Sequence, residues 1–569
     1  MTKMKLFSLL MMVVLLVSAC ATPQSPTATS VPPTEKPTEA PTTAPTATPA
    51  EAATSGVATF IFTQEFDTLN PLYTNMFFSS ITQQIWNCWA WDFDDQNNPI
   101  PVLVSEMPSV ENGGISPDGK VITLKLRQDL VWSDGEPITS ADFLFTYEMY
   151  INPKNAVATT SPYDLFEKLE APDEYTVVTT FKEPYAPWMG TLWHGLIPAH
   201  ILQPVFEADG TLNDAEWNRK PTVGCGPFVF AEWESGSFAR FTANPKYWAG
   251  QPKLAEIFVR FVPDDAAQIA ALTGGEGDLG TFFSNSDVPS LENAGVKVYR
   301  VYSGYNEGFY FYLDPEKGHP ALQDVRVRQA IAYATDRFSL AKDLLLGLTV
   351  PAVSIWDNMP YVDPALKPYP FDPEKARQLL DEAGWTDGNG DGVREKDGVD
   401  LSLTYGTTTR QVRRDTQAVF QQQLAEVGIK VELLNFDSDV FFSGYAEGGP
   451  AAKGELDIFE YSTNPQYPDP DTFDFLCDNI PSDENPTGTN WSAICDEELV
   501  ALFKAQSTQV DFATRQQTFY QISKLIFDKV YWMGIWQDPD LWGVNQRLAN
   551  VRLSGGTPFF NIMEWELAK

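Results

Sequence analysis

The spacing of hydrophobic residues along the chain changes repeatedly between the two-residue period of a strand and the longer period of a helix. From Val121 the stretch "VITLKLRQDLVWSDG" alternates apolar and polar positions before a turn, which predicts a strand. The stretch "SADFLFTYEMYI" predicts a helix that Ser140 caps. The run "DVRVRQAIAYATDRFSLAKDLLLG" predicts one long amphipathic helix, capped by Asp324 and ended by Gly347. Strand-like and helix-like runs mixed in this way indicate α/β lobes.

The first residues have a different pattern. Lys3 and Lys5 precede a 12-residue stretch, Leu6 to Val17, that is apolar except for Ser8 and is too short to span a bilayer. The following "VSAC" resembles the lipobox of bacterial lipoproteins, so residues 1–20 are predicted to be a lipoprotein signal peptide with Cys20 as the acylated residue. The alternative is an ordinary signal peptide followed by a chance cysteine.

Residues 21–56 are predicted to be a disordered linker. This segment is rich in Thr and Pro, with eight prolines and no aromatic residue between positions 21 and 55. Such a composition buries too little apolar surface to offset the entropy of ordering the chain. The N-terminus therefore suggests a lipid-anchored, extracytoplasmic protein, periplasmic or on the outer cell surface, whose folded body is tethered to the cell membrane.

The folded body begins near Val57 and contains about 510 residues, which is enough for two or three lobes. The net charge of −37 is spread along the chain, whereas nucleic-acid binding requires clustered Lys and Arg. We therefore expect no nucleic-acid partner, and the acidity is consistent with solubility at a cell surface.

Besides Cys20 the chain has four cysteines, an even number that outside the cytoplasm suggests disulfides. Four cysteines allow three pairings. The 18-residue spacing of Cys477 and Cys495 in a polar stretch favours a bond between them, which leaves Cys88 with Cys225. The alternative is that these thiols are free and buried.

No motif indicates catalysis. The chain has only three histidines, and it lacks H-E-x-x-H, G-x-S-x-G, a Walker A loop and C-x-x-C. We expect no enzymatic activity and no cofactor. A lipid-anchored hydrolase with two carboxylates at a fixed spacing across a cleft is the alternative from another functional class.

One stretch has partial calcium-loop spacing. "DGNGDG" places Asp387, Asn389 and Asp391 at alternate positions before a glycine, as in the first half of an EF-hand loop. The twelfth position is Gly398 instead of glutamate. A solvated turn after a helix is the favoured interpretation, and a structural Ca²⁺ site is the alternative.

Seven stretches resemble, in order, the family 5 extracellular solute-binding proteins, the receptors of dipeptide/oligopeptide-type ABC importers. They are "LKLRQDLVWSDGEPITSADFLFTYEM" (124–149), "VGCGPFVF" (223–230), "NPKYWAGQPKL" (244–254), "FVPDDAAQIAALTGGEGDLG" (261–280), "HPALQDVRVRQAIAYATDR" (319–337), "FDPEKARQLLDEAGW" (371–385) and "YPDPDTF" (467–473).

The resemblance implies an α/β, two-lobed periplasmic-binding-protein-like fold (class II, cluster C type) with a hinge between the lobes. It places lobe 1 at residues 57–306 and 532–569 and lobe 2 at residues 307–531. It also implies a monomer that captures a solute between its lobes and delivers it to the subunits of an ABC permease. Closure of two lobes on a ligand buries most of its surface.

The ligand class is open between a peptide, an oligosaccharide and another small solute such as a metal chelate. In peptide-binding relatives an aspartate that pairs with the ligand ammonium occupies the position of Gln466, and a neutral amide cannot neutralise that charge. Arg410 lies close to the position where these relatives have an arginine for the ligand carboxylate. The ligand-binding residues predicted from the resemblance and from the lobe junctions are Leu69, Asn70, Tyr73, Phe77, Tyr305, Asn306, Arg410, Gln466 and Tyr467.

Overall fold

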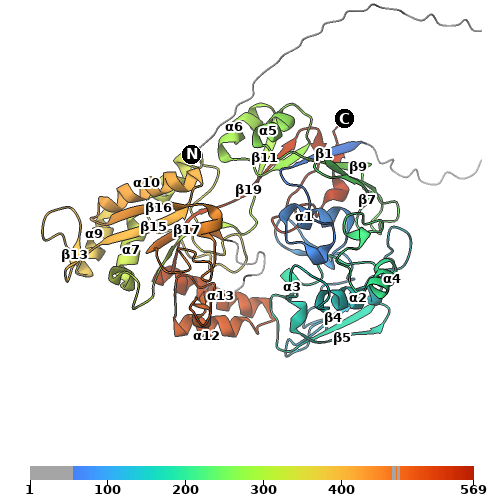
Figure 1. Ribbon diagram of the computed structural model, residues 1–569, viewed down its shortest axis with the longest axis horizontal. Helices are drawn as coiled ribbons and strands as arrows, with labels where there is room; N and C mark the ends of the chain where they lie inside the picture. Colours follow the sequence, from blue (N-terminus) through green and yellow to red (C-terminus); the bar gives the residue numbers. More distant parts are fainter. Residues whose placement is uncertain (1–55, 464–469, 471–474, 569) are drawn as a thin grey trace, which may run out of the picture. The chain divides into compact units, whose positions relative to one another are not determined.

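The computed structural model describes residues 56–463, 470 and 475–568. These residues form a pair of large mixed sheets, each of which is packed into a hydrophobic core of its own (Figure 1). No helix among them is long and apolar enough to span a membrane.

The sheet of lobe 1 has seven strands, and its central strands β1, β9 and β10 are parallel. A strand from near the C-terminus, β19, lies antiparallel between β10 and β11. In spatial order the strands are β11 (Val296–Val301), β19 (Asp540–Asn545), β10 (Leu279–Thr281), β1 (Val57–Phe62), β9 (Glu256–Phe261), β8 (Phe238–Ala243) and β7 (Phe228–Glu234).

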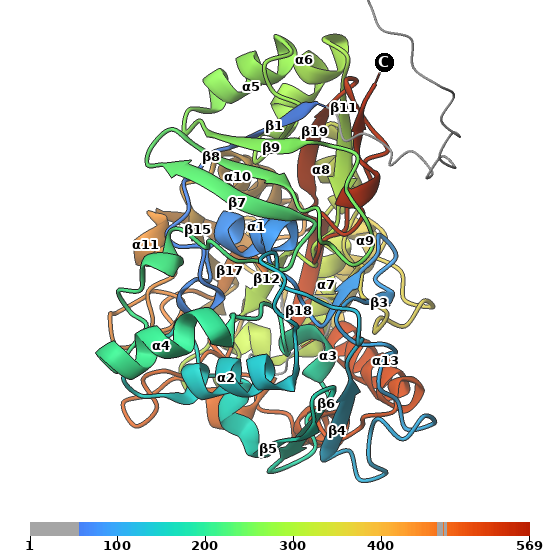
Figure 2. The ribbon, with the colours of Figure 1, turned by 90° about the vertical axis from the view of Figure 1, so that its right-hand side faces the viewer.

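Lobe 1 also contains a small antiparallel sheet, β4 (Val121–Lys125), β6 (Thr176–Phe181) and β5 (Phe166–Asp173), and Figure 2 shows helix α2 beside it. The helices of this lobe are α1 (Phe77–Trp86), α2 (Ser140–Ile151), α3 (Trp188–Thr191), α4 (Ala199–Asp209), α5 (Asp265–Thr273) and α6 (Val288–Asn293). Its short strand pairs are β2 (Trp91–Phe93) with β3 (Pro99–Pro101) and β20 (Leu548–Ala549) with β21 (Glu566–Leu567).

The sheet of lobe 2 has five strands in the order β16 (Lys430–Phe436), β15 (Ser402–Thr408), β17 (Ile458–Thr463), β12 (Asn306–Phe311) and β18 (Trp532–Gln537). The first three are parallel to one another. Helix α10 (Gln411–Ala425) packs on this sheet through Phe420, whose ring lies 4.6 Å from that of Phe309.

The remaining helices of lobe 2 are α7 (Val325–Ala334), α8 (Arg337–Asp343), α9 (Pro373–Glu382), α11 (Ser438–Phe441), α12 (Glu497–Gln506) and α13 (Phe512–Lys529), and a short hairpin joins β13 (Glu395–Lys396) to β14 (Val399–Asp400).

The chain crosses between the two sheets twice. The first crossing lies between Val301, the end of β11, and Asn306, the start of β12. The second lies at residues 538–539, because β18 pairs with β12 in lobe 2 and only β19 returns to the sheet of lobe 1. The predicted return at Trp532 is therefore six residues too early: Trp532 and Trp536 belong to the core of lobe 2.

Two helix predictions need correction. The run from Asp324 to Gly347 forms two helices, because Thr335 leaves the helical conformation and the Asp336 carboxylate accepts the Ser339 N–H at 3.0 Å, which starts α8. Helix α2 is capped by Thr139 and not by Ser140. Thr139 forms a capping box in which its own N–H donates to the Asp142 carboxylate.

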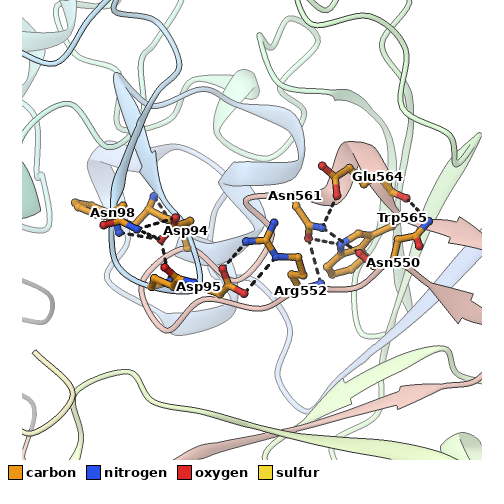
Figure 3. A network of polar contacts seen from close by, with 11 residues as sticks. Asp94, Asp95, Asn98, Asn550, Arg552, Asn561, Glu564 and Trp565 are labelled. Atoms are coloured by element: carbon orange, nitrogen blue, oxygen red, sulfur yellow. Dashed lines mark hydrogen bonds and ion pairs between the residues drawn. The ribbon is translucent and has the colours of Figure 1, made fainter.

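Disulfides and a polar network hold distant segments together. Cys88 is bonded to Cys225 and Cys477 to Cys495, the same pairs that the sequence analysis favours. Figure 3 shows how the C-terminal segment is fixed on lobe 1: the Arg552 guanidinium binds the Asp95 carboxylate, with Nε 3.2 Å from Oδ2. Beside it Trp565 Nε1 donates to Asn561 Oδ1 at 2.7 Å.

Candidate functional site

Two large cavities among the described residues have walls from both lobes. The first, of about 770 Å³, lies at the two crossings and is called the crossing cavity. Its lining residues are Asp265, Thr281, Phe282, Phe283, Ser284, Asn285, Ser286, Tyr305, Leu344, Leu345, Arg410, Gln411, Val412, Asp415, Ser462, Trp536, Asp538, Pro539, Asp540 and Leu541. The second, of about 620 Å³, is called the α13 cavity and includes Trp188 and Met189 of lobe 1 and Met359, Phe512 and Arg515 of lobe 2.

The topology explains the position of the crossing cavity. Thr281 ends β10 in lobe 1, and in lobe 2 Arg410 follows β15, which ends at Thr408. Both strands run parallel to a neighbour in their sheet. In open α/β sheets the carboxyl ends of parallel strands are where ligands bind, because loops and helix N-termini converge there. The crossing cavity therefore has the position of a ligand site.

Two of the predicted residues lie in this cavity. Tyr305 belongs to the first crossing and has 44% of its surface exposed. Arg410 precedes α10 and its guanidinium lies 3.8 Å from the Asp538 carboxylate. A third, Phe77 of α1, is next to the wall: its ring lies 5.0 Å from that of Phe282.

Four other predicted residues do not line either cavity. Leu69 is fully buried in the core of lobe 1, and Tyr73 is half-buried against that core. Asn70 is also buried, where its amide donates to Asn218 Oδ1 at 2.8 Å and its carbonyl oxygen accepts the Leu72 N–H. The buried amide of Asn306 donates to the Gly304 carbonyl at 3.0 Å. The position of a motif in the sequence does not show which way its side chains point. Leu69, Asn70 and Tyr73 pack within lobe 1, and Asn306 holds the first crossing.

Gln466 and Tyr467 lie outside the described residues, as does Cys20. They stay predictions of the sequence.

A buried charge cluster lies behind the cavity wall. Arg413, on the first turn of α10, binds Glu307 of β12 through two hydrogen bonds, Nε to Oε1 at 2.8 Å and Nη2 to Oε2 at 3.1 Å. Glu460 of β17 is fully buried nearby and accepts a hydrogen bond from the Tyr405 hydroxyl. Burial, and next the charge of Glu307, raise the pKa of Glu460 well above its ordinary value.

The walls of the crossing cavity are acidic. Asp265, Asp415, Asp538 and Asp540 line it, whereas Arg410 is the only Lys or Arg among the described lining residues. Burial raises the pKa of Asp540 to about 6; the hydrogen bond from Ser303 opposes this rise and the charge of Asp538 adds to it. Burial also raises the pKa of Tyr305, with further contributions from Asp540 and Asp538. Sequence analysis missed these aspartates, because only the second crossing brings them beside Tyr305.

The loop with calcium-like spacing is arranged as a turn. The two carboxylate oxygens of Asp387 accept the N–H groups of Gly390 and Gly392, and Asn389 donates its amide to Asp391 at 3.2 Å. Among the residues that the structure describes, no group of three or more His, Cys, Asp or Glu side chains is placed to hold a metal ion.

Comparison with known proteins identifies relatives over most of the chain. Residues 98–476 match the model of bacterial extracellular solute-binding proteins, family 5. A Brucella ovis protein whose name describes it as an ABC transporter peptide-binding protein is 31% identical over 435 residues, 74% of this chain and 77% of that protein. The oligopeptide-binding protein AppA of Bacillus subtilis is 26% identical over 490 residues, 84% of this chain and 85% of AppA.

Solved structures share the fold. AppA of Bacillus subtilis in complex with a nonapeptide matches with a TM-score of 0.65 at 24% identity, covering 90% of this chain and 99% of that one. The ABC transporter substrate-binding protein CtaP of Listeria monocytogenes matches with a TM-score of 0.75 at 22% identity, covering 91% of this chain and all of that one (100%).

Proposed function

Since this chain belongs to the bacterial extracellular solute-binding proteins of family 5, we propose that it is the substrate-binding receptor of an ABC importer and that its solute is a peptide. The receptor role requires no bond to be made or broken: the protein captures its solute between the two lobes and presents it to a permease. The peptide class is supported by the names of the relatives, two of which are described as peptide-binding.

The observation that carries the proposal is the crossing cavity. Its walls come from both sheets and from both crossings, so a ligand in it contacts both lobes at once. A ligand that contacts both lobes stabilises their closed arrangement by its differential affinity for that state. A volume of about 770 Å³ is within the usual range for small-molecule sites and is sufficient for a short peptide segment.

A calorimetric titration tests this function. Peptides of two to nine residues and β-linked gluco- and xylo-oligosaccharides are titrated into the purified protein. We expect heat and one-to-one binding with peptides only. Binding of the oligosaccharides without binding of any peptide would contradict the proposed solute class.

Two variants test whether the peptide binds in the crossing cavity. Gln411 is exposed on the first turn of α10 and lines the crossing cavity, so Gln411→Trp fills the cavity and is expected to weaken peptide binding at least tenfold. Gln422 is exposed on the same helix and does not line the cavity, so Gln422→Trp is the matched control and should bind like the wild type. Equal affinities for the two variants would place the ligand elsewhere.

We also propose that Cys20 anchors the protein to the membrane by a lipid. The basis is the sequence "VSAC" after a short apolar run and before a Pro-rich segment. In the native host Cys20→Ala should move the protein from the membrane fraction to the soluble fraction. A variant that still sediments with the membrane would refute the anchor.

A further inference from the structure

The described walls of the crossing cavity carry a net negative charge. Four aspartates line it, and the formal charge of its described walls is −3 when Arg410 is counted against them. Asp538 of the second crossing and Asp540, the first residue of β19, flank Pro539, and each contributes to the rise in the pKa of Tyr305. Both carboxylates line the same cavity as Tyr305, and the charge of Asp538 raises the pKa of Asp540, as expected for like charges that repel each other.

Arg410 does not provide a free positive charge for an anionic ligand. Its guanidinium is paired with Asp538 at 3.8 Å. It also lies near the buried carboxyl groups of Glu307 and Glu460, whose pKa values burial raises and the Arg413 and Arg410 charges lower. An anionic ligand group would have to displace Asp538 and would then face the remaining aspartates of the wall.

Asp540, in contrast, has no ion-pair partner among the described residues. Its side chain accepts the hydrogen bond that Ser303 Oγ donates to Oδ2 at 2.6 Å. Apposed carboxylates in a partly desolvated wall are costly unless a cation joins them. A ligand cation placed there would relieve the repulsion between Asp538 and Asp540 and would gain two charge-assisted interactions.

The aromatic residues of the cavity indicate an organic cation. Phe282 is 47% exposed and Tyr305 is 44% exposed, and both line the cavity. Aromatic rings attract ammonium and guanidinium groups through the ring quadrupole, and these two rings line the same cavity as the carboxylates. A bare metal ion fits less well, because the described residues contain no cluster of three metal-binding side chains.

From this geometry we propose that the crossing cavity is selective for a positively charged organic group, such as the side chain of a lysine or arginine in a bound peptide. Asp540 is the specificity-determining carboxylate, Asp538 supports it while holding Arg410, and the rings of Tyr305 and Phe282 form the flanking walls. The proposal rests on the proposed receptor function and adds the charge class of its solute.

The test uses three pentapeptides that differ at one position: Ala-Ala-X-Ala-Ala with X as lysine, norleucine or glutamate. Norleucine keeps most of the lysine side chain and removes its charge. We expect the wild type to bind the lysine peptide at least tenfold more tightly than the norleucine peptide, with the glutamate peptide weakest. The preference should shrink as NaCl is raised, because salt screens partly exposed charges.

Two variants and a control test which residues produce the preference for the lysine peptide. Asp540→Asn should remove most of the lysine preference and change the affinity for the norleucine peptide less than about twofold, because a neutral side chain loses no ion pair. Asp538→Asn frees Arg410 and should raise the affinity for the glutamate peptide. Glu316→Gln removes the same charge from an exposed loop outside the cavity and should preserve the lysine preference.

The outcomes separate the two proposals. Peptides that bind without any charge preference, or a lysine preference that survives in Asp540→Asn, would overturn the cation site and leave the receptor function intact. If no peptide binds, the peptide function fails, and spermidine tests the site alone: binding that Asp540→Asn abolishes supports the cation site, and absence of binding overturns it.

Discussion

At the scale of single residues, the buried pair of Glu307 and Arg413 holds the cavity wall in place. Glu307 is the second residue of β12, just after the first crossing, and Arg413 lies about one helical turn beyond Arg410. The side chains of the pair are 0% and 7% exposed, and Arg413 Nη1 also donates to Thr408 Oγ1 at 3.0 Å. The pair thus fixes the first turn of α10 against the ends of β12 and β15, and with it the position of Arg410.

Arg413→Met is expected to lower the free energy of unfolding by about 3–5 kcal/mol, because it leaves the buried Glu307 carboxylate without its partner. The double variant Glu307→Gln/Arg413→Met should lose less than the sum of the two single variants. Urea denaturation measures both. The control is Arg377→Met, which breaks an exposed pair with Glu374 and should cost less than about 1 kcal/mol. A loss of that size in Arg413→Met would contradict the role given to the pair.

If Asp540 binds the cation, the affinity for the lysine peptide should depend on pH. The pKa of Asp540 is raised to about 6, chiefly by burial; the titratable groups that line the cavity beside it are Asp538, which is paired with the Arg410 guanidinium, and the neutral phenol of Tyr305. A bound cation favours the ionised carboxylate, so affinity for the lysine peptide should rise as pH increases through about 6 and level off above it. In Asp540→Asn this rise should disappear. An identical pH profile in the variant, measured by calorimetry between pH 5 and about 8, would show that Asp540 does not control binding.

The same pKa has a consequence for stability. Because the folded-state pKa of Asp540 lies above its value in the unfolded chain, its contribution to stability is complete below the unfolded pKa and is lost as pH rises through about 6. The wild type should therefore become less stable relative to Asp540→Asn over this pH range. Destabilisation of this kind at a cavity wall is typical of a site arranged for a ligand.

At the scale of elements, the two disulfides close loops of very different length. Cys88, just after α1, is joined to Cys225, just before β7, across 137 residues, whereas Cys477 and Cys495 are 18 residues apart. In the chain-entropy model the longer loop restricts the unfolded state more.

Replacing both cysteines of each bond by serine should lower the free energy of unfolding by about 5 kcal/mol for Cys88–Cys225 and about 3 kcal/mol for Cys477–Cys495. Urea denaturation of the two double variants against the wild type gives the comparison. A larger loss for the shorter loop would mean that native packing around Cys477, and not loop entropy, determines the cost.

The starts of some helices can be predicted from the sequence, whereas a break between two helices cannot. The helix that starts after Asp324 and the one in "DPEKARQLLDEAGW", now α9, follow from hydrophobic period and capping residues. The break before α8 does not, since Asp336 is compatible with a helix interior until its carboxylate binds the Ser339 N–H. Likewise Tyr305 and Arg410 are predictable from motifs beside the cavity, but Asp538 and Asp540 reach it only through strand pairing across the whole chain.

At the scale of the folded body, the lobes have separate cores: the core of lobe 2 runs from Phe309 to Trp536, and buried residues of the lobe 1 cores follow from Leu541. The lobes also meet near the α13 cavity, where the Ala186 N–H donates to the Ser507 carbonyl at 3.4 Å. A solute held between two separately packed lobes can change their arrangement without unfolding either one, which is the property that a permease needs in order to distinguish loaded from empty receptor.

The most direct test of this account is native mass spectrometry of the protein purified without denaturation from its natural host, followed by release and sequencing of any bound molecule. The account predicts one peptide per chain, enriched in lysine or arginine, present in the wild type and in Gln422→Trp and absent from Gln411→Trp. A bound oligosaccharide, or a peptide that Gln411→Trp retains in full, would contradict peptide capture in the cavity between the lobes.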